Sequence, residues 1–122
     1  MRTIAEILYI KRNTTPVLTI RVDGVNYNDL TKVVFGFKSC LHKNAPLLLK
    51  KTISKSSTDA FTDYSGGDGF TVLVWLTAEE TFKFEPGDLF VDVYPVAGSS
   101  IINTGLPIRY EVIDTTLDEV IS

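Results

Sequence analysis

The sequence is poor in the residues that most often provide metal ligands, nucleophiles and covalent cross-links. Its 122 residues include one cysteine, Cys40, and one histidine, His42. A lone cysteine excludes an internal disulfide, and its setting beside Leu41 after a strand-like run predicts a small core residue more readily than a reactive thiol. One Cys and one His also fall short of the ligand set of a structural zinc site. We therefore expect neither a metal nor a cofactor.

Long apolar runs and an excess of basic charge are missing as well. No apolar stretch approaches the ~18 residues of a membrane-spanning helix, and the segment Met1–Glu6 places an early charge inside a short apolar stretch, unlike a signal peptide. Nothing here predicts export or membrane insertion. The net charge of -3 and the pI near 5.0 give no broad basic surface. Nucleic acid is therefore a disfavoured partner, and only a local basic patch stays open.

What the sequence does contain is typical of a globular domain. Hydrophobic residues make up 44% and charged residues 22%, far from the composition of a disordered chain. The length predicts one domain over residues 1–122, with 114–122 as a trailing segment.

Segments rich in β-branched and aromatic residues, separated by clusters of Gly, Pro, Asn, Asp and Ser, predict strands almost throughout. Helical periodicity is nearly absent. We expect an all-β sandwich of about seven antiparallel strands with one short helical turn, because a parallel α/β fold would alternate strands with long helices. The expected strands cover residues 4–11, 17–22, 32–39, 47–53, 70–76, 89–94 and 103–113.

Alternation within these strands predicts which side chains are buried. Val33, Phe35 and Phe37 share one face, which we assign to the core. By the same argument Asp92 lies on the outward face of its strand. Lys50 and Lys51 interrupt an apolar run and are typical of a strand near a sheet edge.

Three other local patterns predict backbone structure. Thr77 and Glu80 match a capping box, which indicates one helical turn. Pro107 interrupts the last expected strand and indicates an edge position or a bulge. The polar stretch Ser54–Gly69 is the candidate for the most mobile region, interrupted only by Ala60, Phe61 and Tyr64.

No pattern predicts catalysis. The carboxylates of Asp63, Asp68, Asp92 and Glu111 are the best candidates for an enzyme, yet their spacing gives no reason to expect them to converge. The stretch Asp63–Gly69 lacks both the ligand alternation of a calcium loop and the Lys-Ser/Thr ending of a phosphate loop. Adjacent Glu79 and Glu80 point in different directions on a helical turn. We expect a protein that is not an enzyme and has no catalytic residue.

Four aromatic residues are candidates for a protein-binding or sugar-binding surface. Tyr9, Trp75, Phe90 and Tyr94 occupy strand positions where an outward side chain would meet a partner. Packing in the core or at a sheet edge is the alternative for each of them.

With the strands placed, the sequence resembles the N-terminal immunoglobulin-like domain of the upper baseplate protein family of phages and prophages of Gram-positive bacteria. The likeness runs along most of the chain, and its most specific part is Trp75–Thr81, similar to a leucine, Thr and Glu-rich turn in that family. The other matching pieces, in order, are Val17–Val22, Asp23–Gly24, Asp29–Thr31, Val33–Phe37, Leu49–Ile53, Pro86–Gly87, Leu89–Val93 and Gly105.

The resemblance implies an immunoglobulin-like fold and a structural role in the virion. Such a protein would be made in the bacterial cytoplasm, would bind other tail or baseplate proteins, and would help to anchor receptor-binding components, as an oligomer. Family members usually continue into a coiled-coil stalk, whereas no heptad repeat occurs here, so we expect an anchor module. The alternative is another bacterial immunoglobulin-like module that binds protein or carbohydrate.

Overall fold

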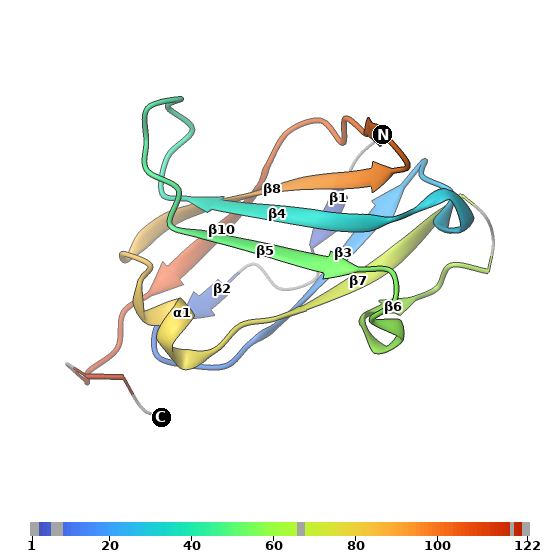
Figure 1. Cartoon of the computed structure of the whole chain (residues 1–122). Helices are drawn as coiled ribbons and strands as arrows, with labels where there is room; N and C mark the ends of the chain where they lie inside the picture. The colour runs from blue at the N-terminus through green and yellow to red at the C-terminus, as the bar shows by residue number, and fades with distance from the viewer. Residues whose placement is uncertain (1–2, 6–8, 66–67, 118, 121–122) are drawn as a thin grey trace.

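A computed structural model describes residues 3–5, 9–65, 68–117 and 119–120, and it is built almost entirely from strands (Figure 1). One α-helix, α1 (Ala78–Phe82), and two 3₁₀ helices, η1 (Tyr27–Asp29) and η2 (Thr58–Ala60), accompany them. The strands are β1 (Thr3–Ala5), β2 (Tyr9–Lys11), β3 (Val17–Asp23), β4 (Lys32–Lys38), β5 (Leu49–Ser54), β6 (Phe61–Thr62), β7 (Gly69–Trp75), β8 (Gly87–Ala97), β9 (Ser100–Ile101) and β10 (Ile108–Ile113).

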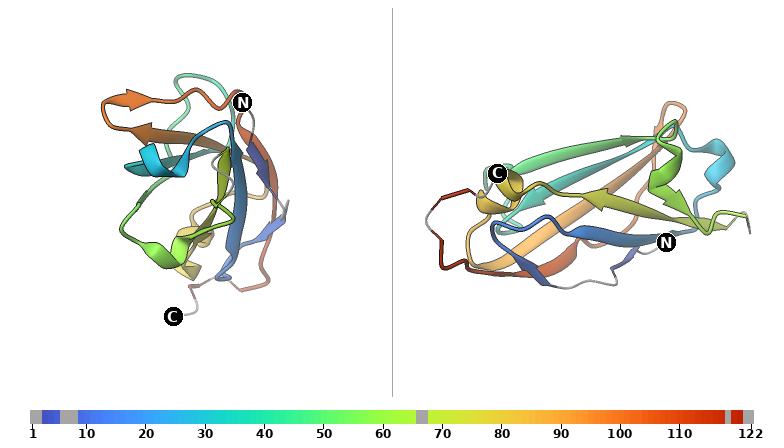
Figure 2. Two further views of the ribbon diagram at one scale, coloured as in Figure 1. Left: turned by 90° about the vertical axis from the view of Figure 1, so that its right-hand side faces the viewer. Right: turned by 90° about the horizontal axis from the view of Figure 1, so that it is seen from below.

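The strands form two sheets packed face to face (Figure 2). The four-stranded sheet has the order β1-β3-β7-β6, and the six-stranded sheet has the order β2-β10-β8-β4-β5, with β9 beside β8. This order is that of an immunoglobulin-like sandwich, in which the second, fifth and fourth strands of the fold pair in one sheet and the third, sixth and seventh pair in the other. The predicted all-β, immunoglobulin-like fold class is confirmed.

The N-terminal strand differs from the prediction of one strand over residues 4–11. β1 pairs antiparallel with β3 in one sheet, whereas β2 pairs parallel with β10 in the other. The chain therefore changes sheets between β1 and β2. Residues 6–8 of the predicted strand lie outside the described residues. Alternation of apolar residues shows which side faces inward, but both sheets face the same core, so it does not reveal a change of sheet. The expectation of antiparallel pairing throughout is wrong at β2 and β10.

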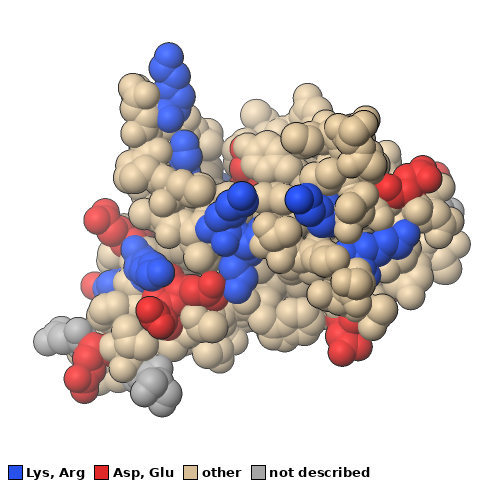
Figure 3. All heavy atoms as spheres, in the orientation of Figure 1, with Lys and Arg blue, Asp and Glu red and all other residues tan. Residues whose placement is uncertain are grey.

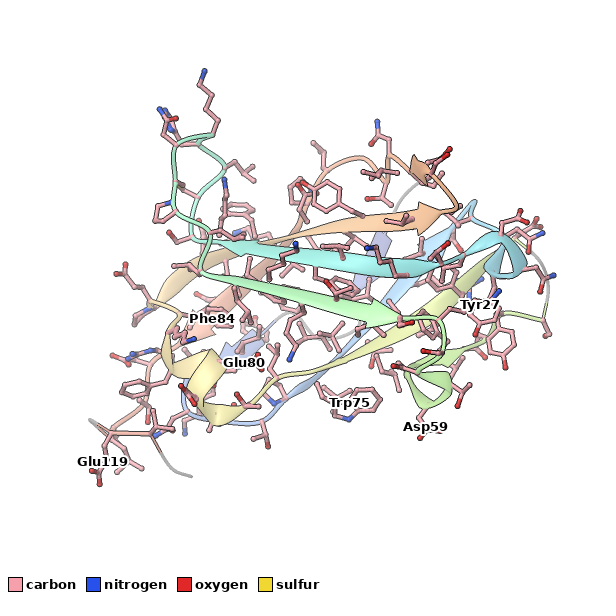
Figure 4. The ribbon with its side chains drawn as sticks, viewed as in Figure 1. Tyr27, Asp59, Trp75, Glu80, Phe84 and Glu119 are labelled. Carbon is pink, nitrogen blue, oxygen red and sulfur yellow. The ribbon has the colours of Figure 1, made fainter. Side chains whose placement is uncertain are left out.

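The alternation of side chains along β4 correctly predicted which residues enter the core. Val33, Phe35 and Phe37 are all fully buried. The ring of Phe37 stacks on the ring of Phe84, with centroids 5.7 Å apart and planes 17° from parallel. Phe84 follows α1 and enters the end of the sandwich (Figure 4). A residue outside any strand thus completes the core at this end.

Glu80 joins the two sheets at the same end. Its carboxylate accepts a hydrogen bond from the backbone N–H of Thr77, the Thr77 hydroxyl accepts one from the N–H of Glu80, and the predicted capping box is confirmed. Lys51 of β5 donates to both carboxylate oxygens of Glu80, at 3.1 and 3.0 Å. β5 is last in the sheet order, which confirms the edge position predicted from Lys50 and Lys51. Exposed Lys50 carries a charge at that edge, which disfavours pairing with another strand.

The few apolar residues of the polar stretch 54–69 pack against the rest of the fold. It contains η2 and β6, and both Ala60 and Phe61 are buried. The Tyr27 ring stacks on Tyr64 with centroids 4.2 Å apart and lies 5.5 Å from the Phe61 ring. Gly66 and Gly67, in the middle of the stretch Asp63–Gly69, lie outside the described residues.

Two further expectations differ from the structure. β10 begins at Ile108, directly after Pro107, so the proline precedes the strand and β10 lies between β2 and β8, away from the sheet edge. Cys40 is exposed, not a core residue. β4 ends at Lys38, so strand alternation no longer decides the direction of side chains two residues later.

Replacing Phe37 by alanine is expected to lower the free energy of unfolding by about 3–5 kcal/mol, since a buried ring is removed and its contact with Phe84 is lost. Urea denaturation measures the change. Lys32→Ala, on the exposed side of the same strand, should stay within about 0.5 kcal/mol of the unchanged protein. If Phe37→Ala does not fold, Phe37→Leu serves in its place with a smaller loss, and equal effects at both positions would contradict the assigned core.

Glu80→Gln is expected to destabilise the protein at neutral pH by about 1–2 kcal/mol, because hydrogen bonds to an ionised group are stronger. Burial raises the pKa of Glu80, but hydrogen bonds from Thr77 and Lys51 and the Lys51 charge outweigh it and leave the pKa below its usual 4.5. The stabilisation is therefore present above pH 4.5 and is lost as pH falls through the lower folded value. Urea denaturation at pH 7 and under acid conditions tests this, with the exposed Glu79→Gln as control. A difference independent of pH would refute the ionic contribution.

Candidate functional site

Three of the four predicted interface aromatics lie on one face of the molecule. Phe90 and Tyr94 point outward from β8, and Tyr9 lies on the same side of β2, at the sheet edge. Tyr9 is 60% exposed and Tyr94 41%, while Phe90 is half-buried. We call this side of the six-stranded sheet the docking face. Trp75 is 48% exposed but belongs to β7 of the other sheet, and it points away from the sandwich (Figure 4).

The docking face is hollowed at its centre. An open depression of about 410 Å³ lies over β4 and β8. The loop of residues 39–48 stands away from the sandwich beside it (Figure 1) and contributes Leu41 and Leu47 to the lining. The floor includes Val34, Gly36 and the half-buried ring of Phe90. Apolar surface therefore lines the middle of an otherwise polar sheet face.

Gly36 gives the depression its depth. It lies in the middle of β4, where the neighbouring outward positions carry Val34 and Lys38. A Cβ atom at Gly36 would lie 3.5 Å from Cδ1 of Leu47, which is ordinary contact distance. The Leu47 side chain thus rests over a strand position without a side chain. A larger residue at Gly36 would fill the depression from its floor.

Polar groups surround this floor. The Tyr94 hydroxyl donates a 2.6 Å hydrogen bond to Oδ2 of Asp92, two residues earlier on β8. This bond and partial burial raise the pKa of Tyr94 to about 12, because both disfavour the phenolate. Lys38 and Lys50 line the opposite side, on β4 and β5. The prediction that Asp92 points outward is confirmed.

The sequence did not single out most of the residues that form the depression. Leu41 and Leu47 lie in a polar loop, and both are more than half exposed, at 60% and 52%. Two leucines kept in a surface loop are a signal that sequence reasoning could have used. Gly36 was a second signal, since glycine weakens a strand unless another group approaches closely.

The candidate carboxylates do not come together. Asp63 and Asp68 lie beside β6 and β7 of the four-stranded sheet, whereas Asp92 and Glu111 lie on the docking face. Glu111 pairs in register with Asp88, four residues along β8 from Asp92, which separates the two carboxylates by about 13 Å. Within the described ranges no group of His, Cys, Asp and Glu is arranged to hold a metal ion. These four carboxylates therefore form no acid–base pair with one another.

None of the helices in the described part of the chain has the length and apolar character needed to cross a membrane. No family model matches the sequence, and no curated protein matches it. Among solved structures, the chain is similar to one in the crystal structure of a swine CD8aa homodimer. The two share 16% identity and a TM-score of 0.41, over 94% of this chain and 97% of that one. The strand order described above is what defines the fold as an immunoglobulin-like β-sandwich.

Asp92→Ala is expected to lower the pKa of Tyr94 from about 12 toward 10.0, since the variant removes both the acceptor and the negative charge that disfavour ionisation. An NMR titration of tyrosine labelled at Cζ follows this group directly. Glu111→Ala, which removes an exposed carboxylate on β10, should leave the titration of Tyr94 unchanged. An unchanged Tyr94 in the Asp92 variant would contradict the hydrogen bond at the edge of the depression.

Proposed function

We propose that the protein is a structural component of a phage or prophage tail, which binds other virion proteins and helps to anchor receptor-binding components. Binding takes place on the docking face. The observation that carries this proposal is the apolar depression in the middle of that face, with polar groups around it. Protein interfaces commonly combine an apolar centre containing aromatic residues with a polar rim.

The chemistry of the depression favours a protein partner. Tyr94 and Phe90 offer large ring surfaces that lose little conformational entropy on binding. Leu41 and Leu47 add exposed apolar area that water contacts in the free protein. Burying this area against a partner supplies affinity, while Lys38, Lys50 and Asp92 fix the partner's orientation.

The virion setting is supported by the sequence resemblance to the upper baseplate protein family. Its most specific part, Trp75–Thr81, includes the capping box that orients Glu80 toward Lys51. The segment therefore supports the end of the sandwich, and the docking face is formed by other strands. In this proposal the protein is made in the bacterial cytoplasm and acts in the assembled tail.

The alternative of a carbohydrate-binding module has less support. Exposed Trp75 and Tyr94 are the residues that would serve such a module, but they belong to different sheets. A sugar ring stacked on one of them would not reach the other.

Val34→Asp places a charge on the apolar floor and is expected to weaken binding to a tail partner about tenfold or more, since a desolvated unpaired charge is costly. Purified products of neighbouring tail genes serve as probes in light scattering and calorimetry. Trp75→Ser, which alters an exposed aromatic residue on the other sheet, is the control and should bind normally. Loss of binding in the Trp75 variant alone would move the interface to the four-stranded sheet. Binding of no tail protein, together with signals on a glycan array, would favour the carbohydrate module.

A further inference from the structure

Basic and acidic residues are concentrated in different segments of the chain, although the net charge is only -3. Residues 30–58 contain six lysines and no acidic residue. Residues 59–122 contain twelve acidic residues and only two basic ones. The first segment forms β4, β5 and the loop between them, and the second includes β8 and β10. The six-stranded sheet is therefore basic on one side and acidic on the other.

We call β4, β5 and the loop of residues 39–48 the basic arm. In Figure 3, Lys and Arg side chains form a band over these strands and continue onto the loop. Lys51 is engaged with Glu80 inside the fold. The other lysines of the arm, in the part of the chain that the structure describes, form no ion pair: Lys32, Lys38, Lys43 and Lys50.

The acidic flank lies on the same face, on the next two strands of the sheet, β8 and β10. It consists of Asp88 and Asp92 on β8 and Glu111 on β10. Asp88 forms an ion pair with Arg109, with 2.7 Å between Oδ1 and Nη2, and both side chains are about half exposed or more. Glu111 is an exposed neighbour of Asp88 in the register. The flank thus holds three carboxylates and one arginine, Arg109, and keeps a net negative charge opposite the unpaired lysines.

A two-fold rotation can place the basic arm of one copy over the acidic flank of a second copy. An axis that runs along the strands between β4 and β8 places β4 of one copy over β8 of the other, and β5 over β10. Val34 and Tyr94 are register partners, so each would meet the other residue in the second copy. Lys38, the partner of Phe90, would likewise face the Phe90 ring of the second copy.

We propose that the docking face binds a second copy of this chain, forming a two-fold dimer in which the basic arm of each copy covers the acidic flank of the other. The inference rests on the proposed function in that it uses the same face, and it names the partner. The apolar depressions of the two copies are buried against each other at the centre. The charges at the rim select the orientation, because a dimer that stacked β4 on β4 would set the lysines of one copy against those of the other.

Sedimentation velocity and light scattering on the full chain test the dimer. The dimer should weaken as ionic strength rises from about 0.01 M to about 1 M, where the screening length falls from roughly 30 Å to roughly 3 Å. The arm variant carries Lys38→Glu and Lys50→Glu. The flank variant carries Asp88→Lys and Asp92→Lys, because the register places Lys38 and Lys50 of one copy nearest to these two carboxylates of the other. Each alone should raise the dissociation constant about tenfold or more, since attraction becomes repulsion. All four positions are on the surface, and urea denaturation checks that the variants remain folded.

Mixing the two variants is the decisive measurement. In a mixed dimer each reversed charge meets a reversed partner, so association should return close to that of the unchanged protein. A wild-type chain that stays monomeric at every concentration, or a dimer insensitive to both variants, overturns the inference. If the monomer still binds a tail protein and Val34→Asp abolishes that binding, the proposed function stands without the second copy. If mixing restores the dimer but the protein binds no tail protein, the inference is supported and the virion role is contradicted.

Discussion

The packing of aromatic rings between the two sheets is the interaction on which the rest of the structure depends. No disulfide is available, because the sequence has a single cysteine. Phe35 and Phe37 are buried without exposed surface, and Phe84 enters from the end of the sandwich to stack on Phe37. Burial of these rings holds the sheets together, and that leaves the outward side of β4 free to carry Val34, Gly36 and Lys38. The depression exists because the core is complete without these residues.

Charge and apolar surface have separate roles on the docking face. The apolar floor supplies area that gains free energy wherever it is buried, without regard to the partner's orientation. In the proposed dimer, the lysines of the basic arm and the carboxylates of the acidic flank add a preferred orientation of one copy relative to the other. Lys51 is the exception, since its charge is paired with Glu80 inside the fold.

Local patterns in the sequence predicted the parts of the fold that depend on local physics. The burial of Val33, Phe35 and Phe37 follows from strand alternation, and the capping box at Thr77 follows from the spacing of two side chains. The change of sheet between β1 and β2 was missed because a strand has the same alternation in either sheet. Most of the candidate site was missed too. Leu41, Leu47 and Gly36 meet only through the fold, and no spacing along the chain encodes their contact.

The parallel pairing of β2 with β10 has a mechanical consequence. The register pairs of these two strands join residues 9–11, near the N-terminus, to residues 111–113, near the C-terminus. A force that pulls the two ends in opposite directions slides these strands past each other, so their hydrogen bonds are loaded together. An antiparallel hairpin under the same tension would open one bond at a time. A tail component that carries tension between its neighbours would gain resistance from this short pairing, at almost no cost in chain length.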